Sequence, residues 1–97
     1  MRAVELAVYA DALAGEAASL SARAERARSR IRQAAIEKGA RAELTAVAVE
    51  RLETLGLLGA IDVTAARAEL RELEAVLDAL EELQSWVDGE LEAATAA

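Results

Sequence analysis

Apolar residues recur at alternating steps of three and four over two long stretches of the chain, and this heptad spacing constrains the fold more than any other feature. Such spacing places a stripe of apolar side chains along one side of an α-helix. In the first stretch the stripe consists of Leu6, Ala10, Leu13, Ala17, Leu20, Ala24, Ala27, Ile31 and Ala34. In the last stretch it consists of Val63, Ala66, Leu70, Leu73, Leu77, Leu80, Gln84, Val87 and Leu91. No segment alternates as a strand would, so the sequence predicts an all-α helical bundle of antiparallel coiled-coil type.

Alanine supplies about half of the first stripe. Of the 97 residues, 26 are alanine and 14 are leucine, the two strongest helix formers. Large and small residues alternate through Leu20, which lets a neighbouring helix approach closely. Val76 and Leu83 widen the last stripe so that it can touch two neighbours, and the single Trp86 at its edge is expected to be partial core. We therefore expect an ordered fold with a thin core.

Glycines are the main signals for where helices end, because the chain contains no proline. Lys38 before Gly39 is typical of a basic last helical turn followed by a left-handed cap. Gly56 and Gly59 mark a second connection, after which Asp62 can cap a new helix. These signals predict a single domain with helices at about residues 3–38, 41–57 and 63–94.

The predicted lengths indicate a dimer. Helices of about 36 and 32 residues would measure roughly 54 and 48 Å at 1.5 Å per residue. If the second helix folds back from Gly39, it covers the first only down to about Leu20 and leaves Ala3–Ala14 uncovered, where only Glu5 and Asp11 are charged. We therefore predict a homodimer in which a second chain covers this half, with another helical protein as the alternative partner. The predicted interface residues are Val4, Leu6, Val8, Tyr9, Leu13 and Leu20.

The alternative is a break in the first helix. A break near Gly15 or within Ser19–Ser21 would let the first helix fold back on itself. The result would be a compact four-helix monomer.

The net charge of −7 divides into two opposed blocks. Residues 21–41 carry a net charge of +5, and residues 68–97 carry −8. Like charges four residues apart within each block repel one another by roughly 0.2–0.5 kcal/mol per pair. We expect the two helices to lie together, either within one chain or across the dimer, so that the blocks neutralise each other.

The arginine block also raises the alternative of a nucleic-acid-associated regulator. Arg23, Arg26 and Arg30 are the candidates for a face that contacts nucleic acid or an acidic partner. No aromatic residue lies among them for base stacking, and the overall acidity opposes non-specific binding.

Conventional catalytic chemistry finds little support. The chain has no histidine and no cysteine, so no conventional nucleophilic triad can form, and neither a cofactor nor a metal site is predicted. Carboxylates are the abundant groups with potential for chemistry. The segment Glu81-Glu82-Leu83-Gln84-Ser85 resembles the Glu-Glu-x-x-Glu pattern of all-α nucleotide pyrophosphohydrolases of the MazG type, but it lacks the last glutamate of that pattern. That resemblance implies a third function, Mg²⁺-dependent nucleotide hydrolysis.

Location and role complete the expectations. No apolar run approaches the roughly 20 residues of a membrane span, and Glu5 and Asp11 interrupt the only segment that could be a signal peptide. With ten arginines to one lysine and many alanines, the composition is typical of a GC-rich bacterial genome. We expect a cytoplasmic, non-enzymatic interaction or assembly protein that acts as scaffold, adaptor or small subunit through helix–helix packing.

Overall fold

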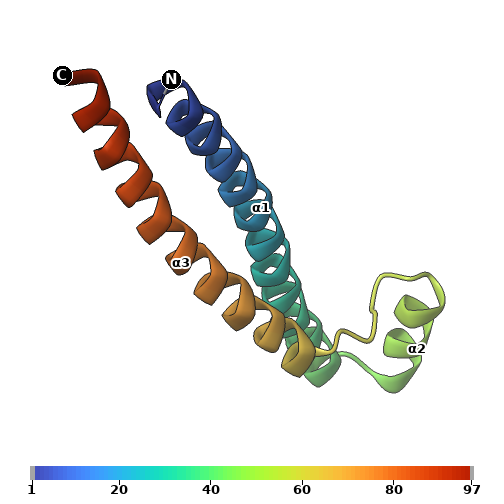
Figure 1. Cartoon of the computed structure of the whole chain (residues 1–97). Helices are drawn as coiled ribbons and strands as arrows, with labels where there is room; N and C mark the ends of the chain where they lie inside the picture. The colour runs from blue at the N-terminus through green and yellow to red at the C-terminus, as the bar shows by residue number, and fades with distance from the viewer. Residues whose placement is uncertain (1, 97) are drawn as a thin grey trace.

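The chain folds into a long helical hairpin. The computed structural model describes residues 2–96, with helices α1 (Arg2–Glu43), α2 (Ala46–Thr54) and α3 (Val63–Ala96). Helices α1 and α3 pack against each other in antiparallel orientation, so the start of α1 and the end of α3 lie together at one end, the open end (Figure 1). The short α2 lies at the opposite end, the tip (Figure 1). No strand occurs among residues 2–96, in agreement with the all-α prediction.

The hairpin is far from globular. It measures 71 × 20 × 16 Å, with a radius of gyration of 21.2 Å, whereas a compact domain of this size would have a radius of gyration near 12–13 Å. Helix α1 has 42 residues and therefore spans about 63 Å at 1.5 Å per residue. The length of α1 alone sets the long dimension of the molecule.

The two predicted stripes face each other along the hairpin. All nine predicted positions of each stripe are buried or half-buried. Ala24 and Ala27 are only 0% and 2% exposed, and across from them Ala66 and Leu73 are 4% and 5% exposed. Alanine makes this burial possible, because its small side chain lets the two helix backbones approach. The buried positions repeat every seven residues along both helices, so residues seven apart keep the same orientation toward the neighbouring helix.

Helix α3 covers the half of α1 that was expected to be uncovered. Arg2 Nη2 lies 2.6 Å from Glu90 Oε2, so the end of α3 reaches the start of α1. Leu6, Leu13 and Leu20 are half-buried in the seam against α3. The expectation that the second helix folds back along the first is therefore wrong. The alternative, a break near Gly15 or within Ser19–Ser21, is also absent, since α1 runs unbroken from Arg2 to Glu43, and a compact four-helix monomer is not formed.

The helix ends near the tip differ from prediction for local reasons. Gly39 lies inside α1, and Gly56, with φ of +74°, is the one described residue with positive φ. Helix α2 begins late because Thr45 caps it, the Thr45 side chain accepting a hydrogen bond of 3.2 Å from the Ala48 amide. It ends early because Gly56 adopts the left-handed conformation, and the Leu57 amide donates back to the Leu52 carbonyl at 2.9 Å. Helix 1 thus extends to Glu43 instead of about residue 38, and helix 2 covers Ala46–Thr54 instead of 41–57.

Two side chains of α1 hold the connection between α2 and α3. The buried carboxylate of Glu37 accepts a hydrogen bond of 3.1 Å from the Gly59 amide. Arg41 donates a hydrogen bond of 3.0 Å to the Gly59 carbonyl and also lies 3.5 Å from Glu53. Asp62 then caps α3, as predicted, by accepting a hydrogen bond of 2.9 Å from the Ala65 amide. We call the Glu37–Gly59–Arg41 contact the clasp, because it fixes where α3 starts relative to α1.

A charge placed in the seam should destabilise the hairpin. Leu13→Asp puts a carboxylate against α3, and we expect a loss of about 2–3 kcal/mol, or a melting temperature lower by roughly 10 °C or more. Thermal denaturation followed by circular dichroism measures this change. Val8→Asp is the matched control, because Val8 lies on α1 with 61% of its surface exposed. Equal melting temperatures for the two variants would contradict the placement of the seam.

Removal of the clasp carboxylate should loosen the tip. Glu37→Ala leaves the Gly59 amide without its acceptor, and we expect a loss of about 1–2 kcal/mol in urea unfolding. Glu37→Gln keeps an oxygen at the same place and should cost less than half as much. A larger loss for Glu37→Gln than for Glu37→Ala would show that the contact is not a hydrogen bond to the Gly59 amide.

Candidate interaction surface

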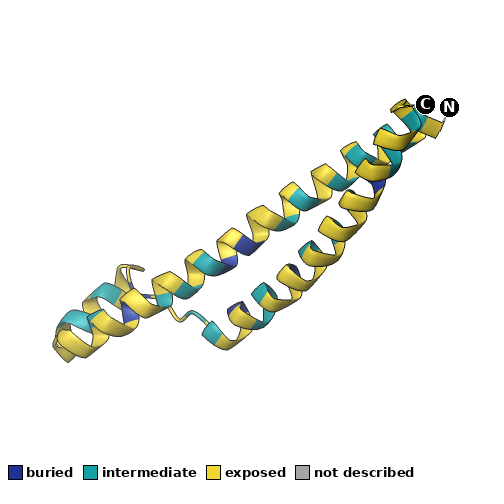
Figure 2. Ribbon diagram, turned by 90° about the vertical axis from the view of Figure 1, so that its left-hand side faces the viewer, coloured by how far each residue is buried: buried dark blue, intermediate teal, exposed yellow. Residues whose placement is uncertain are grey.

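The hairpin buries little and exposes much apolar surface. Six apolar residues are buried in the described part of the chain, and three of them are alanine. Eleven large apolar residues are exposed, and the ribbon coloured by burial is mostly yellow (Figure 2). A two-layer fold with so thin a core makes surfaces, rather than cavities, the places to look for function.

One side of the hairpin is marked by the Arg2–Glu90 ion pair. Tyr9 lies one heptad after Arg2 on α1, while Leu83 and Val76 lie one and two heptads before Glu90 on α3. Because residues seven apart keep the same orientation, these three side chains lie on the same side of the hairpin as the ion pair. Trp86 lies one turn before Glu90 and joins them. We call this set, Tyr9, Val76, Leu83 and Trp86, the aromatic flank.

The aromatic flank is exposed despite its composition. Tyr9 and Trp86 are 65% and 59% exposed, and Val76 and Leu83 are 48% and 47% exposed. They include both aromatic residues of the chain. Trp86, expected as partial core, therefore lies on the surface. The widened stripe that Val76 and Leu83 indicated in the sequence is present, but among the described helices α1 is the one that packs extensively against α3, so the stripe lacks a second neighbour of that kind.

Three arginines continue the same side toward the tip. Arg23 and Arg30 lie three and four heptads after Arg2, and Arg26 lies one turn from both. None of the three forms an ion pair with another residue in the range 2–96. Glu69, three heptads before Glu90, and Glu72 lie on the α3 side of this region and are also without ion pairs among these residues. This side of the hairpin is thus apolar near the open end, where the aromatic flank lies, and charged near the tip.

Two arginines of α1 are paired on the opposite side of the hairpin. Arg28 Nη2 lies 3.3 Å from Glu74 Oε1 on α3, and Arg28 Nη1 lies 3.6 Å from Glu25 on α1. Arg32 donates a hydrogen bond of 2.9 Å to Glu25. The hydrogen bond and charge of Arg32, aided by Arg28, hold the pKa of the Glu25 carboxyl below its usual range. On this side Arg28 and Arg32 have carboxylate partners within the chain, in contrast to Arg23, Arg26 and Arg30 on the side that carries the aromatic flank.

The expected neutralisation of the two charge blocks is limited. Among the described residues, Arg28–Glu74 is the one ion pair that joins the blocks. The reason is geometric: the basic block lies toward the tip, whereas most of the acidic block lies toward the open end, beside residues 3–22 of α1, which include no lysine or arginine (Figure 1). A shallow hollow there is lined by Glu81, Gln84, Ser85, Asp88, Gly89 and Glu92.

The six residues predicted to face a second chain fall on three surfaces. Leu6, Leu13 and Leu20 lie in the seam against α3. Val4 and Val8, 68% and 61% exposed, lie on the outer side of α1. Tyr9 alone belongs to the aromatic flank, where the structure adds three α3 residues that the sequence prediction did not name as interface. The spacing of Leu83 and Trp86 from Glu90 shows in the sequence that these three residues share one side of a helix. That this side lies next to Tyr9 could not be known without the Arg2–Glu90 contact.

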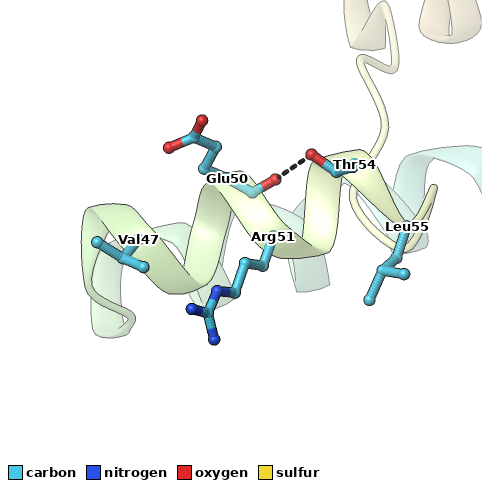
Figure 3. A pocket seen from close by; sticks show the side chains of 5 residues that line it. All are labelled: Val47, Glu50, Arg51, Thr54 and Leu55. Carbon is cyan, nitrogen blue, oxygen red and sulfur yellow. Dashed lines mark hydrogen bonds between the residues drawn. The ribbon is translucent and has the colours of Figure 1, made fainter.

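A second exposed apolar surface lies on α2. Val47 and Leu55 point to the same side of the helix as Arg51, beside a shallow hollow (Figure 3). The Thr54 hydroxyl donates to the Glu50 carbonyl at 2.9 Å, so the polar groups at the hollow are engaged within the helix (Figure 3). No group of converging polar side chains is present there to orient a small ligand.

The carboxylates of α3 do not gather into a metal site. Throughout residues 2–96 no three acidic side chains are placed to hold one metal ion. Glu81 and Glu82, which resemble part of a nucleotide-hydrolase pattern, are adjacent residues and therefore point about 100° apart around the helix. In the described chain no helix is long and apolar enough to cross a membrane.

Comparison with protein-family models, with curated proteins and with solved structures finds no match to this chain.

The Arg32–Glu25 contact should be visible as a shifted titration. We expect the pKa of Glu25, measured by NMR, to lie below its ordinary value and to rise in Arg32→Gln, because the largest cause of the shift is removed. Since folding lowers this pKa, the contact stabilises the hairpin above the pKa of the unfolded chain, and that contribution is lost as the pH falls through the folded pKa. Arg30→Gln is the control and should leave the titration of Glu25 unchanged.

Proposed function

We propose that the chain is a non-enzymatic interaction or assembly protein that binds another helical protein chain through its aromatic flank. The observation that supports this proposal most directly is that Tyr9, Val76, Leu83 and Trp86 are exposed together on one side of the hairpin. Tryptophan, tyrosine and arginine are the residues most enriched at the energetic centres of protein interfaces. Here all three types lie on one side.

The thin core supports the same proposal. Of the large apolar residues in the described chain, eleven are exposed and three are buried. A third and fourth helix on the aromatic flank would convert a two-helix layer into a four-helix arrangement with a core of its own. The role then is that of a scaffold, adaptor or small subunit, and a cytoplasmic location remains part of the proposal.

Nucleic-acid binding is the rival for the same surface. Arg23, Arg26 and Arg30 offer positive charge, but Glu69 and Glu72 on the same side would repel phosphates. The apolar side chains of Leu83 and Val76 would also make no favourable contact with a phosphate backbone. A protein partner accounts for both halves of the surface, whereas nucleic acid accounts for the arginines alone.

Nucleotide hydrolysis remains the third possibility and has less support. It depends on Mg²⁺ held by clustered carboxylates, and the residues that suggest it, Glu81 and Glu82, point in different directions around α3. Turnover of nucleoside triphosphates by the purified chain with Mg²⁺ would favour this function over the proposed one.

The proposal is tested by placing a charge in the aromatic flank, which should abolish or weaken partner binding. We expect the wild-type chain to associate with a helical protein, whether a second copy or another chain, and Leu83→Asp to weaken that association at least about tenfold. Pull-down from an extract of the producing cells, with light scattering of the purified chain, measures both cases. Wild-type association should change less than about tenfold between 50 and 200 mM salt, where contacts to 6–10 phosphates would weaken by about 10³–10⁵.

Ser85→Asp is the matched control. Ser85 is exposed on α3, lies two residues from Leu83, and lines the hollow on the opposite side of the hairpin. The control should bind as wild type does, and both variants should keep the helical circular dichroism signal. Equal binding by Leu83→Asp and wild type, or binding to nucleic acid alone, would contradict the proposed function.

A further inference from the structure

We infer that the helical protein bound by the aromatic flank is a second copy of this chain, with both hairpins pointing in the same direction and α1 of each packed on α3 of the other. This inference rests on the proposed function and specifies its partner. It follows from how charges are distributed between the two helices on this side of the hairpin.

Helix α1 is basic on this side, and helix α3 is acidic. Arg2, Arg23, Arg26 and Arg30 outnumber Glu5 and Glu16 on the α1 part of the side, whereas Glu69, Glu72 and Glu90 carry the charge on α3. A helix of one kind therefore attracts a helix of the other kind and repels its own kind. The surface is self-complementary only when α1 of one copy meets α3 of the other.

A twofold-symmetric dimer through the side that carries the aromatic flank can be built in two ways. A twofold axis along the hairpin puts α1 on α3 of the second copy with both tips at the same end, while an axis across the hairpin puts α1 on α1 with the tips at opposite ends. In the second arrangement the arginines of α1 would face α1 of the second copy, and the carboxylates of α3 would face α3 of the second copy. These like-charge contacts disfavour it.

The first arrangement matches residues level by level. The Arg2–Glu90 and Arg28–Glu74 ion pairs together bracket the register of the two helices. Between these limits Tyr9 lies near the level of Leu83 and Trp86. Arg23 and Arg26 lie near the level of Glu69 and Glu72. In the symmetric pair Tyr9 then packs against Leu83 and Trp86 of the second copy. Arg23 and Arg26 meet Glu69 and Glu72 of the second copy, which supplies the ion pairs that these arginines lack within one chain.

Area and the remaining charge are compatible with this pairing. A face 71 Å long and 20 Å wide exceeds the roughly 800 Å² per partner that a stable interface buries. The acidic residues beside Ser85 lie on the opposite side of each hairpin. In the dimer they are separated by more than the Debye length of about 8 Å at physiological salt.

A spin label at the tip tests the arrangement. The chain has no cysteine, so Ala42→Cys, at an exposed position in the last turn of α1, accepts a single label. With the hairpins parallel, double electron–electron resonance should give a distance below about 40 Å, because helix layers pack 8–10 Å apart and each hairpin is 20 Å wide. With the tips at opposite ends of a 71 Å molecule, the distance would exceed about 50 Å, and that result would overturn the inference.

A charge exchange tests the contacts. Arg26→Glu and Glu72→Arg should each weaken dimerisation at least about tenfold in analytical ultracentrifugation, because both symmetric contacts become repulsive. The double variant restores opposite charges across the interface and should recover to within about threefold of wild type. A double variant weaker than either single one would overturn the inference.

The outcomes separate this inference from the proposed function. A wild-type chain that stays monomeric at about 100 µM, yet binds a different helical protein in a manner lost in Leu83→Asp, would overturn the second copy as partner and leave the proposed function in place. A chain that binds neither itself nor another helical protein would overturn both. A dimer with close tips, broken by Leu83→Asp and restored by the charge exchange, supports both.

Discussion

The contact between the seams of α1 and α3 is the interaction on which the rest of the structure depends. It is the contact through which the two long helices fold, and it is built largely from alanine and from half-buried leucine. Such a seam holds two helices close together but removes little apolar surface from water, because an alanine side chain has little to bury. The same choice of residue that permits the hairpin therefore leaves it thin.

The two sides of the seam then acquire different characters. On one side Arg28 and Arg32 form ion pairs with Glu74 and Glu25 within the chain. On the other side, beyond the Arg2–Glu90 pair, aromatic and aliphatic side chains are exposed and Arg23, Arg26 and Arg30 have no described ion-pair partner. The asymmetry lets one side face water while the other is suited to a protein surface.

Much of this fold is readable from the sequence, and the failures have identifiable causes. Every position that periodicity assigned to the two stripes is buried or half-buried, because burial on a helix follows spacing. Gly39 misled the assignment of the first helix end, since a glycine signal competes with the Thr45 cap six residues later, and the cap prevailed. Glu37 was counted among surface charges although it continues the stripe three residues after Ala34, and only the fold shows that Gly59 meets it.

The pairing of helices was the step that sequence reasoning could not supply. Without knowing that α3, and not α2, lies along the first half of α1, the level of Tyr9 with Leu83 cannot be deduced. Of the candidate surface, the sequence therefore found Tyr9 and the three arginines but did not join them to Trp86. Local rules determine helices, whereas the choice of neighbour depends on the clasp and on loop geometry.

The antiparallel path also determines how the hairpin responds to mechanical load. Arg2 and Ala96 lie at the same end (Figure 1), so a force that pulls them apart acts across the seam and separates α1 from α3 one turn at a time, starting at Arg2–Glu90. Each step breaks only a few contacts, which makes this direction weak. A force between the tip and the open end instead runs along both helix axes and must shear many seam contacts at once. The molecule is thus a strut that resists load along its length and unzips when its two ends are drawn apart.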